Sequence, residues 1–212
     1  MSQSSNDVIP TAMHCAYYVD TAEKLMPAMD LLIDTIAKKI AQYHGVVKTG
    51  RTHLMDAMPL TIDQELGAWN TQLLNARASL ITVLDALRFL PQGGTAVGTG
   101  INAHPRFARE FCKAISPLVG FKAETSNDYF RNLSSQDLSV QLSGELKNLA
   151  VILMKISNDL RWMNSGPLAG IAEVELQALQ PGSSIMPGKV NPVIPEAVAM
   201  AGADVIGNDV TV

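Results

Sequence analysis

Apolar residues recur along two long segments of the chain, at spacings that alternate between three and four positions. The first segment begins at Leu66 and the second at Leu138. The two sets are Trp69, Leu73, Ala76, Leu80, Val83, Leu87 and Leu90, and Leu142, Leu146, Leu149, Leu153, Ile156, Leu160 and Met163. An average period of about 3.5 is typical of long helices packed almost parallel or antiparallel. A helix of about 30 residues is roughly 45 Å long and does not bury such a stripe alone. The pattern therefore predicts a long-helix bundle of the all-α class.

Capping and breaking residues mark the ends of these two helices. Thr61 and Gln64 have the spacing of a capping box, which predicts that the first helix begins just after Pro59. Proline and glycine in residues 91–94 end it, and residues 164–167 end the second helix.

Three further helices complete the predicted bundle, and no strand or internal repeat is predicted. They cover residues 7–43 with Pro27 as a candidate break, residues 105–118, and the stretch from residue 192 onward. Gly45 terminates the first of these. Asn191 is the expected N-cap of the last, with Pro192 at its first helical position.

The composition fits this architecture and excludes several functions. The chain has 212 residues, of which 47% are apolar but only 5% aromatic, which suits close helix packing in a single domain. A net charge of −4 argues against a nucleic-acid partner, because phosphate binding needs a basic stripe. There is no run of about 18 apolar residues and no targeting signal, so we expect no membrane partner.

Cysteine and histidine usage points to an intracellular protein without a metal. Cys15 and Cys112 are the two cysteines, both in apolar helical patterns. Two free buried thiols in a reducing compartment are the favoured interpretation, and a disulfide is the alternative. The four histidines show no ligand spacing with cysteines or carboxylates, so no metal is predicted.

Three polar loops stand out, and each is expected to precede a helix directly. They are residues 4–7, 51–56 and 182–191. A helix N-terminus presents unpaired N–H groups and a positive dipole potential, so three such ends together would bind carboxylates well. The alternative is that their Ser, Thr, Asn and Asp residues serve only as caps.

The third loop favours chemistry over capping. It holds two adjacent serines, two glycines, two prolines and a lysine in eleven residues, which suits a loop that exposes a hydroxyl and a cation. A serine hydroxyl acts as a base only where N–H donors or a cation stabilise its alkoxide. Lys189 could be that cation, or could only bind substrate charge. The residues alone therefore indicate a helical enzyme that handles anions.

The same loop resembles a known family. Gly182–Pro192 is similar to the signature of the fumarase/aspartase superfamily, GSSxMPxKxNP. Four more segments resemble the family in its order: Ser4–Pro10 (SSNDVIP), Gly50–Pro59 (GRTHLMDAMP), Gly93–Asn102 (GGTAVGTGIN) and Lys155–Gly166 (KISNDLRWMNSG). Because no strand is expected before the Gly93–Gly100 stretch, a dinucleotide-binding loop is rejected there in favour of a turn between helices.

The resemblance implies a lyase that releases fumarate by reversible trans-elimination through a doubly charged aci-carboxylate intermediate. By this likeness Ser183 is the base that removes the C3 proton. Glu196 would orient and charge His53, and the acid that protonates the departing hydroxyl is either His53 or water. The substrate-binding residues would be Ser4, Ser5, Asn6, Thr52, Lys189 and Asn191. No cofactor and no metal is implied.

Within the superfamily the chain looks like a class II fumarase. Fumarases typically carry Thr-His where aspartases carry Thr-Gln, and this chain has Thr52-His53 and also Gly188, where aspartases usually have Ala. Residues 128–132 depart from the usual fumarase pattern. Aspartate ammonia-lyase is the chemical alternative; argininosuccinate and adenylosuccinate lyases share the signature only loosely.

Length is the largest departure from the family. Full members are more than twice as long, so residues 1–212 resemble their central helical-bundle domain, with the N-terminal and C-terminal domains absent. In the family, three subunits of a homotetramer build each active site. We therefore expect a homo-oligomer, a small dicarboxylate substrate and a cytoplasmic location, mitochondrial in a eukaryote. The other hypothesis is an inactive helical assembly module.

Overall fold

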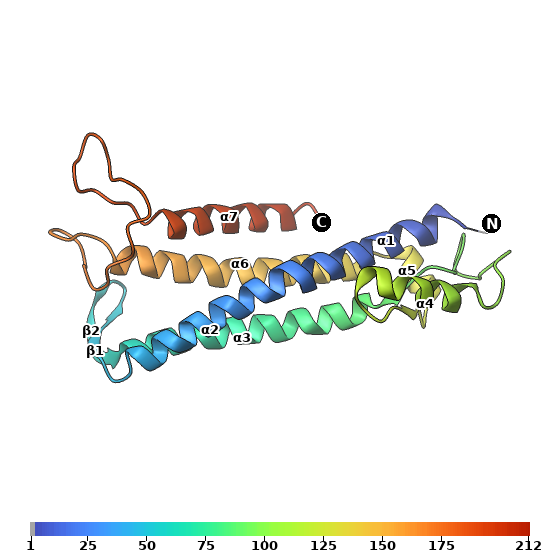
Figure 1. Ribbon diagram of the computed structural model, residues 1–212, viewed down its shortest axis with the longest axis horizontal. Coiled ribbons are helices and arrows are strands. Elements are labelled where there is room, and N and C mark those ends of the chain that lie inside the picture. Colours follow the sequence, from blue (N-terminus) through green and yellow to red (C-terminus); the bar gives the residue numbers. More distant parts are fainter. Residues whose placement is uncertain (1–2) are drawn as a thin grey trace. The chain divides into compact units, whose positions relative to one another are not determined.

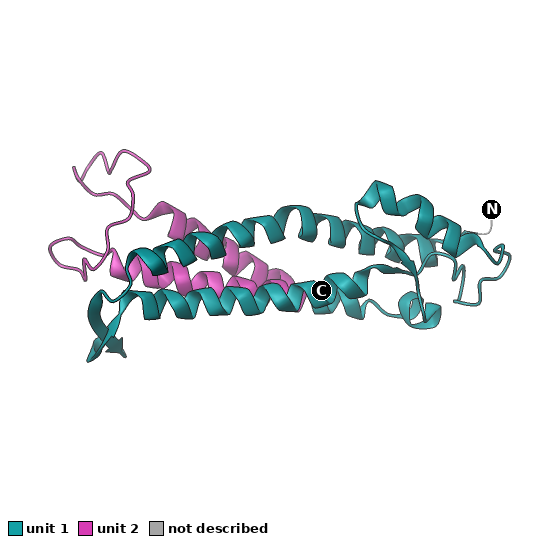
Figure 2. Cartoon of the chain, turned by 60° about the horizontal axis from the view of Figure 1, so that its bottom comes forward, with its two compact units in different colours: residues 1–142 teal, residues 143–212 magenta. Residues whose placement is uncertain are grey.

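The computed structural model describes residues 3–212, which form two compact units, residues 3–142 (unit 1) and 143–212 (unit 2) (Figure 2). The all-α prediction is confirmed, because helices dominate both units and the strands are short. The elements of the described chain are α1 (Ser5–Asp20), η1 (Thr21–Leu25), α2 (Met26–Gln42), β1 (Val47–Thr52), β2 (Met55–Thr61), α3 (Ile62–Leu87), β3 (Phe89–Leu90), α4 (Phe107–Val119), β4 (Glu124–Thr125), α5 (Tyr129–Ser134), α6 (Asp137–Met163) and α7 (Val193–Asp209). That residues 1–212 act as one domain stays a prediction.

The first helical stretch runs from α1 to α2 without leaving helical geometry (Figure 1). The candidate break near Pro27 is a π-helical segment, η1, which ends at Leu25, and Pro27 lies in the first turn of α2. Because the helix is continuous here, the missing N–H of Pro27 removes one helical hydrogen bond, and the chain continues through a local π-helical turn. Helix α2 packs against α3. An ion pair between Arg77 and Asp30 joins the two helices, with Nε donating to Oδ1 at 2.5 Å.

Helix α3 confirms the predicted stripe and its start. Its N-cap is Thr61, in a capping box with Gln64. Six predicted positions, from Trp69 to Leu87, are buried, and three of the leucines have no exposed surface. Leu90 is also buried but lies in β3, because the helix ends at Leu87. On α6 the stripe is partly confirmed: Leu138, Leu142, Leu149, Ile156 and Met163 are buried, whereas Leu146, Leu153 and Leu160 are half-buried.

The prediction that the chain has no strand is wrong at residues 47–61. β1 and β2 form an antiparallel hairpin, so the polar loop at residues 51–56 is a hairpin turn and does not directly precede a helix. A register shift occurs at Gly50, where a Cβ would lie 2.4 Å from the Met58 carbonyl oxygen, so this bulge requires glycine. Buried Lys48 pairs with Glu65 of α3 and fixes the hairpin to that helix.

A small second core lies beneath α4 in unit 1. Leu90, Cys112, Phe121 and Ala123 form it, with Cys15 and Tyr18 of α1 packed against it. Both cysteines are free, as favoured from the sequence, although Cys15 is only half-buried. Burial raises the pKa of the Cys112 thiol to about 11. Here β3 pairs in parallel with β4, so a two-residue strand does precede the glycine stretch. The next helix begins only at Phe107, too far along for a dinucleotide loop.

Unit 2 consists of residues 143–163 of α6, a long loop, and α7. Asp209 joins the two helices, since its Oδ1 accepts from Ser143 Oγ at 2.7 Å and its Oδ2 pairs with Lys147. Gly202 of α7 is buried where a Cβ would lie 2.5 Å from the Met154 side chain, so the helices approach closely. The predicted N-cap is wrong by one residue: Pro192 is the N-cap of α7, and it makes no side-chain capping hydrogen bond.

Candidate active site

The Ser4-Ser5-Asn6 segment forms the N-terminus of α1. Ser4 is the N-cap, and its Oγ accepts the Asn6 backbone N–H at 3.1 Å, so the capping interpretation holds for this residue. Ser5 and Asn6 are exposed in the first turn. The Asn6 side chain is fixed by donating from Nδ2 to the Ala96 carbonyl at 2.7 Å. The exposed Ser5 hydroxyl and Asn6 amide, at the positive end of the helix dipole, suit a carboxylate ligand.

Thr52 and His53 lie at the tip of the β1–β2 hairpin. Thr52 pairs with Met55, so His53 and Leu54 alone make the turn, with φ of +52° and +64°. Both residues are therefore in the left-handed region, which two-residue hairpin turns require but which favours Asn and Gly. A residue with a side chain in this conformation costs on the order of 1 kcal/mol or more. The turn holds the exposed His53 ring out at the end of unit 1.

These two predicted parts of the site lie at opposite ends of unit 1 (Figures 1 and 2). Between Asn6 and the hairpin runs the continuous helical stretch from Ser5 to Gln42. At 1.5 Å per residue it is roughly 55 Å long. Within one chain, Ser4, Ser5 and Asn6 therefore do not share a site with Thr52 and His53.

The signature loop of unit 2 closes on itself around Ser183. The Ser183 N–H donates to the Lys189 carbonyl at 3.0 Å, and the Lys189 N–H donates to the Met186 carbonyl at 3.1 Å. Ser183 Oγ accepts the backbone N–H groups of Ile185 and Met186, at 3.3 and 3.2 Å. Two N–H donors on one hydroxyl oxygen are what stabilises an alkoxide. The loop itself thus supplies N–H donors to the Ser183 hydroxyl, one of the two kinds of group that could stabilise its alkoxide.

Two glycines allow this loop to close. Gly188 has φ of +83°, and a Cβ on Gly182 would lie 2.6 Å from the Lys189 carbonyl oxygen. The Lys189 side chain is exposed beside the turn, and Asn191 is half-buried just before α7. The loop therefore carries both the Ser183 hydroxyl, whose oxygen accepts two N–H groups, and the exposed Lys189 cation.

Glu196 lies in the first turn of α7 and lines a cleft of about 660 Å³ within unit 2. Its other lining residues include Asn158, Arg161 and Asn164, and Arg161 Nη1 donates to Asn158 Oδ1 at 3.0 Å. No role was predicted for these three residues, although they lie in the Lys155–Gly166 segment that carries the resemblance. A guanidinium beside side-chain amides suits carboxylate binding. Whether Glu196 orients His53 stays a prediction, since they belong to different units.

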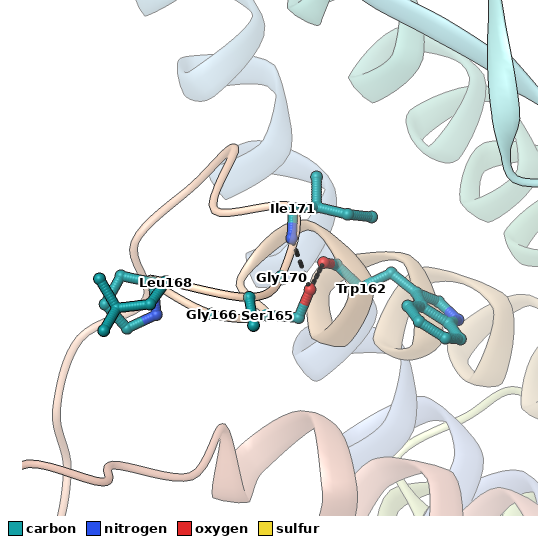
Figure 3. A pocket seen from close by; sticks show the side chains of 8 residues that line it. Trp162, Ser165, Gly166, Leu168, Gly170 and Ile171 are labelled. Carbon is teal, nitrogen blue, oxygen red and sulfur yellow. Dashed lines mark hydrogen bonds between the residues drawn. The ribbon is translucent and has the colours of Figure 1, made fainter.

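A second pocket, of about 710 Å³, lies where α6 ends (Figure 3). Trp162 and the loop of residues 165–171 line it. Ser165 Oγ donates to the Trp162 carbonyl at 2.7 Å and accepts the Ile171 N–H at 3.0 Å, which shapes the loop. No predicted site residue lines this pocket. Among the described residues, no cluster of three or more His, Cys, Asp or Glu side chains could hold a metal ion, and no helix is long and apolar enough to cross a membrane.

Comparison with known proteins covers nearly the whole chain. A family model described as "Lyase" matches residues 1–207. Fumarate hydratase class II 2 of Pseudomonas aeruginosa is 58% identical over 210 residues, covering 99% of this chain and 46% of the relative. Fumarate hydratase class II of Xylella fastidiosa is 56% identical over 212 residues, covering 100% of this chain and 45% of the relative.

A solved structure agrees with these relatives. The crystal structure of class II fumarase from Schistosoma mansoni has a TM-score of 0.95 and 37% identity, and the match covers 100% of this chain and 47% of that one. The chain thus spans about half the length of the proteins it matches. With the signature loop, the Thr52-His53 turn and these matches together, the chain belongs to the class II fumarase group of the fumarase/aspartase superfamily of lyases.

Proposed function

We propose that this chain carries active-site residues for the reversible hydration of fumarate to malate. The observation that carries the proposal is the position of Ser183 Oγ, which accepts two backbone N–H groups in a loop that also exposes Lys189. The names of the class II relatives support the same reaction.

In the proposed mechanism Ser183 removes the C3 proton of malate as an alkoxide. The Ile185 and Met186 N–H groups stabilise that alkoxide, so a larger fraction of the hydroxyl is present in the deprotonated form that can accept the proton. Lys189 and Asn191 bind one substrate carboxylate, where the charge of the aci-carboxylate develops. The barrier to proton removal falls because the site binds the charge of the aci-carboxylate more tightly than it binds the charge of the substrate carboxylate.

The remaining groups bind the other end of the substrate and handle the hydroxyl. Ser4, Ser5, Asn6 and Thr52 bind carboxylate oxygens in this scheme. His53, charged and oriented by Glu196, contacts the departing hydroxyl, which His53 or a water molecule protonates. Because one chain holds Asn6 and His53 at opposite ends of unit 1, such a site needs more than one copy. We therefore propose a homotetramer with shared sites; the cytoplasmic location stays a prediction.

The test is fumarate hydration, followed by absorbance at neutral pH. The 212-residue chain is assayed first, with its size measured in parallel. A chimera in which the chain replaces the matching segment of the Pseudomonas aeruginosa relative is assayed next. Ser183→Ala in whichever protein is active should abolish turnover and leave the oligomer intact. The matched control is Ser184→Ala, because Ser184 is exposed and adjacent, and it should stay active.

Each result separates the candidates. Turnover by the chain alone would exclude the inactive assembly module. A silent chain with an active chimera would mean that the residues are competent but depend on further segments. Silence in both would refute the proposal. Rapid addition of ammonia without addition of water would replace it with aspartate ammonia-lyase.

A further inference from the structure

The glycine-rich stretch after β3 has no role in the proposed reaction, yet it is built against the N-terminus of α1. Its first part, residues 93–96, is called the glycine turn here. Gly93 has φ of +110°, and Thr95, a β-branched residue, has φ of +59°. A β-branched residue in the left-handed region is a genuine outlier that costs on the order of 1–3 kcal/mol. Such a conformation persists only where neighbouring groups hold it.

The group that holds it is the carboxylate of Asp7, which has no exposed surface. Asp7 Oδ2 accepts the N–H of Gly93 at 3.0 Å and that of Thr95 at 2.9 Å. Asp7 Oδ1 accepts the N–H of Ser4 at 3.2 Å. One buried side chain thus ties the N-cap of α1 to a turn more than 80 residues away in the sequence.

Asn6 makes the second connection, through Nδ2 to the Ala96 carbonyl at 2.7 Å. Two buried side-chain atoms, Thr95 Oγ1 in the turn and Gln92 Nε2 just before it, have no hydrogen-bond partner among the described residues, so they add no connection to α1. The hydrogen bonds between the glycine turn and α1 therefore end on Asp7 and Asn6. Asn6 belongs to the Ser4–Asn6 segment proposed to bind substrate, and Asp7 directly follows that segment.

The glycine turn is itself fixed from behind. A Cβ on Gly93 would lie 2.6 Å from the Cβ of Ala108 in α4, and one on Gly94 would lie 3.0–3.1 Å from Leu133 and Tyr129 of α5. The turn therefore rests on two helices and has no room to shift. A rigid support of this kind suits a binding loop that must hold its geometry.

We propose that Asp7 is a positioning residue: through the glycine turn it fixes Ser4, Ser5 and Asn6 in the geometry that binds a substrate carboxylate. This rests on the proposed function for the identity of the substrate, a C4 dicarboxylate. Asp7 itself touches no substrate and acts through Ser4, Ser5 and Asn6. Since a carboxylate remote from the reacting carbon is bound alike in the ground and transition states, loosening the segment weakens binding and spares the chemical step.

The test is Asp7→Asn in the active protein, chain or chimera. The amide keeps the size of the side chain but places an NH₂ group where one oxygen accepted hydrogen bonds. We expect the KM for fumarate and the Kd for succinate, an unreactive dicarboxylate, each to rise about tenfold, with kcat within about twofold of the parent. The matched control is Thr11→Val, which removes a buried hydrogen bond of 2.7 Å to the Asp7 carbonyl within the same helix. It should leave KM and Kd unchanged.

Gly93→Ala is the second variant, in case Asp7→Asn does not fold. It displaces the turn and should reproduce the rise in KM and Kd, whereas Gly67→Ala, on α3 with open space at its Cβ, should not. A purely structural Asp7 would lower the urea midpoint of folded variants with KM and Kd unchanged, and that result would overturn the inference. A parent that binds succinate but does not hydrate fumarate would refute the proposed function alone, because the Kd comparison still decides the role of Asp7.

Discussion

Leu80 lies in the middle of the buried stripe of α3, and its truncation tests the packing on which the fold depends. Its side chain has no exposed surface, and Leu73 and Leu87, one heptad away on either side, have none either. With rigid neighbours in the same row, the space left by Leu80→Ala does not collapse easily. The cost is then the lost transfer free energy plus a cavity, about 3–5 kcal/mol.

The matched control is Leu74→Ala on the same helix. Leu74 is 47% exposed, so the same chemical change removes about half as much buried surface and leaves no closed cavity. We expect it to cost about 1 kcal/mol or less. Both variants are measured by urea unfolding, followed by circular dichroism at one protein concentration, because a linked association would change the apparent stability. Equal losses, or a loss below about 1 kcal/mol for Leu80→Ala, would refute the assignment of this stripe to the core.

Three further predictions concern single groups in unit 1. Burial lowers the pKa of His14, whose Nδ1 lies 3.2 Å from the Phe89 carbonyl oxygen, so the folded chain binds fewer protons than the unfolded chain. The free energy of unfolding should therefore fall as pH drops below about 6.5, by at most about 1.4 kcal/mol per pH unit. In urea unfolding, His14→Gln should lose this pH dependence, and an unchanged dependence would contradict the role of His14. Leu54→Asn should raise the stability by about 0.5–1 kcal/mol in thermal unfolding, since Asn tolerates the left-handed turn, and a loss would mean that the turn is unstrained. Cys112, with its pKa of about 11, should react with iodoacetamide at pH 8 far more slowly in the folded chain than in urea; equal rates would contradict its burial.

The long helices were predictable because their signals are local. The capping box at Thr61 and the stripe on α3 depend on residues a few positions apart, and both were found where expected. The hairpin was missed for a physical reason. Val47 and Met58, in its two strands, are 69% and 82% exposed, so neither apolar residue faces a core and the usual apolar–polar alternation of a half-buried strand is missing. The turn gives no signal either, because His53-Leu54 stands where a common two-residue turn has Asn-Gly.

The resemblance proposed candidate site residues one by one, but their arrangement in space was not predictable. The resemblance pointed to Ser183, and its hydroxyl was expected to need N–H donors or a cation nearby. The structure places the N–H groups of Ile185 and Met186 on it. Asp7 gave no signal beyond a cap position, because its partners Gly93 and Thr95 lie far away in the sequence. Long-range hydrogen bonds of this kind have no periodicity to reveal them.

Residues at opposite ends of one chain are proposed to act in one site, which requires several copies. The most direct measurement is complementation between two inactive variants of the active protein, Asn6→Ala and His53→Ala. We expect each variant alone to lack fumarate hydration. Refolding the two together should restore turnover well above their sum, because mixed assemblies contain sites with both residues intact. Activity no greater than the sum, in assemblies shown to contain both chains, would contradict it.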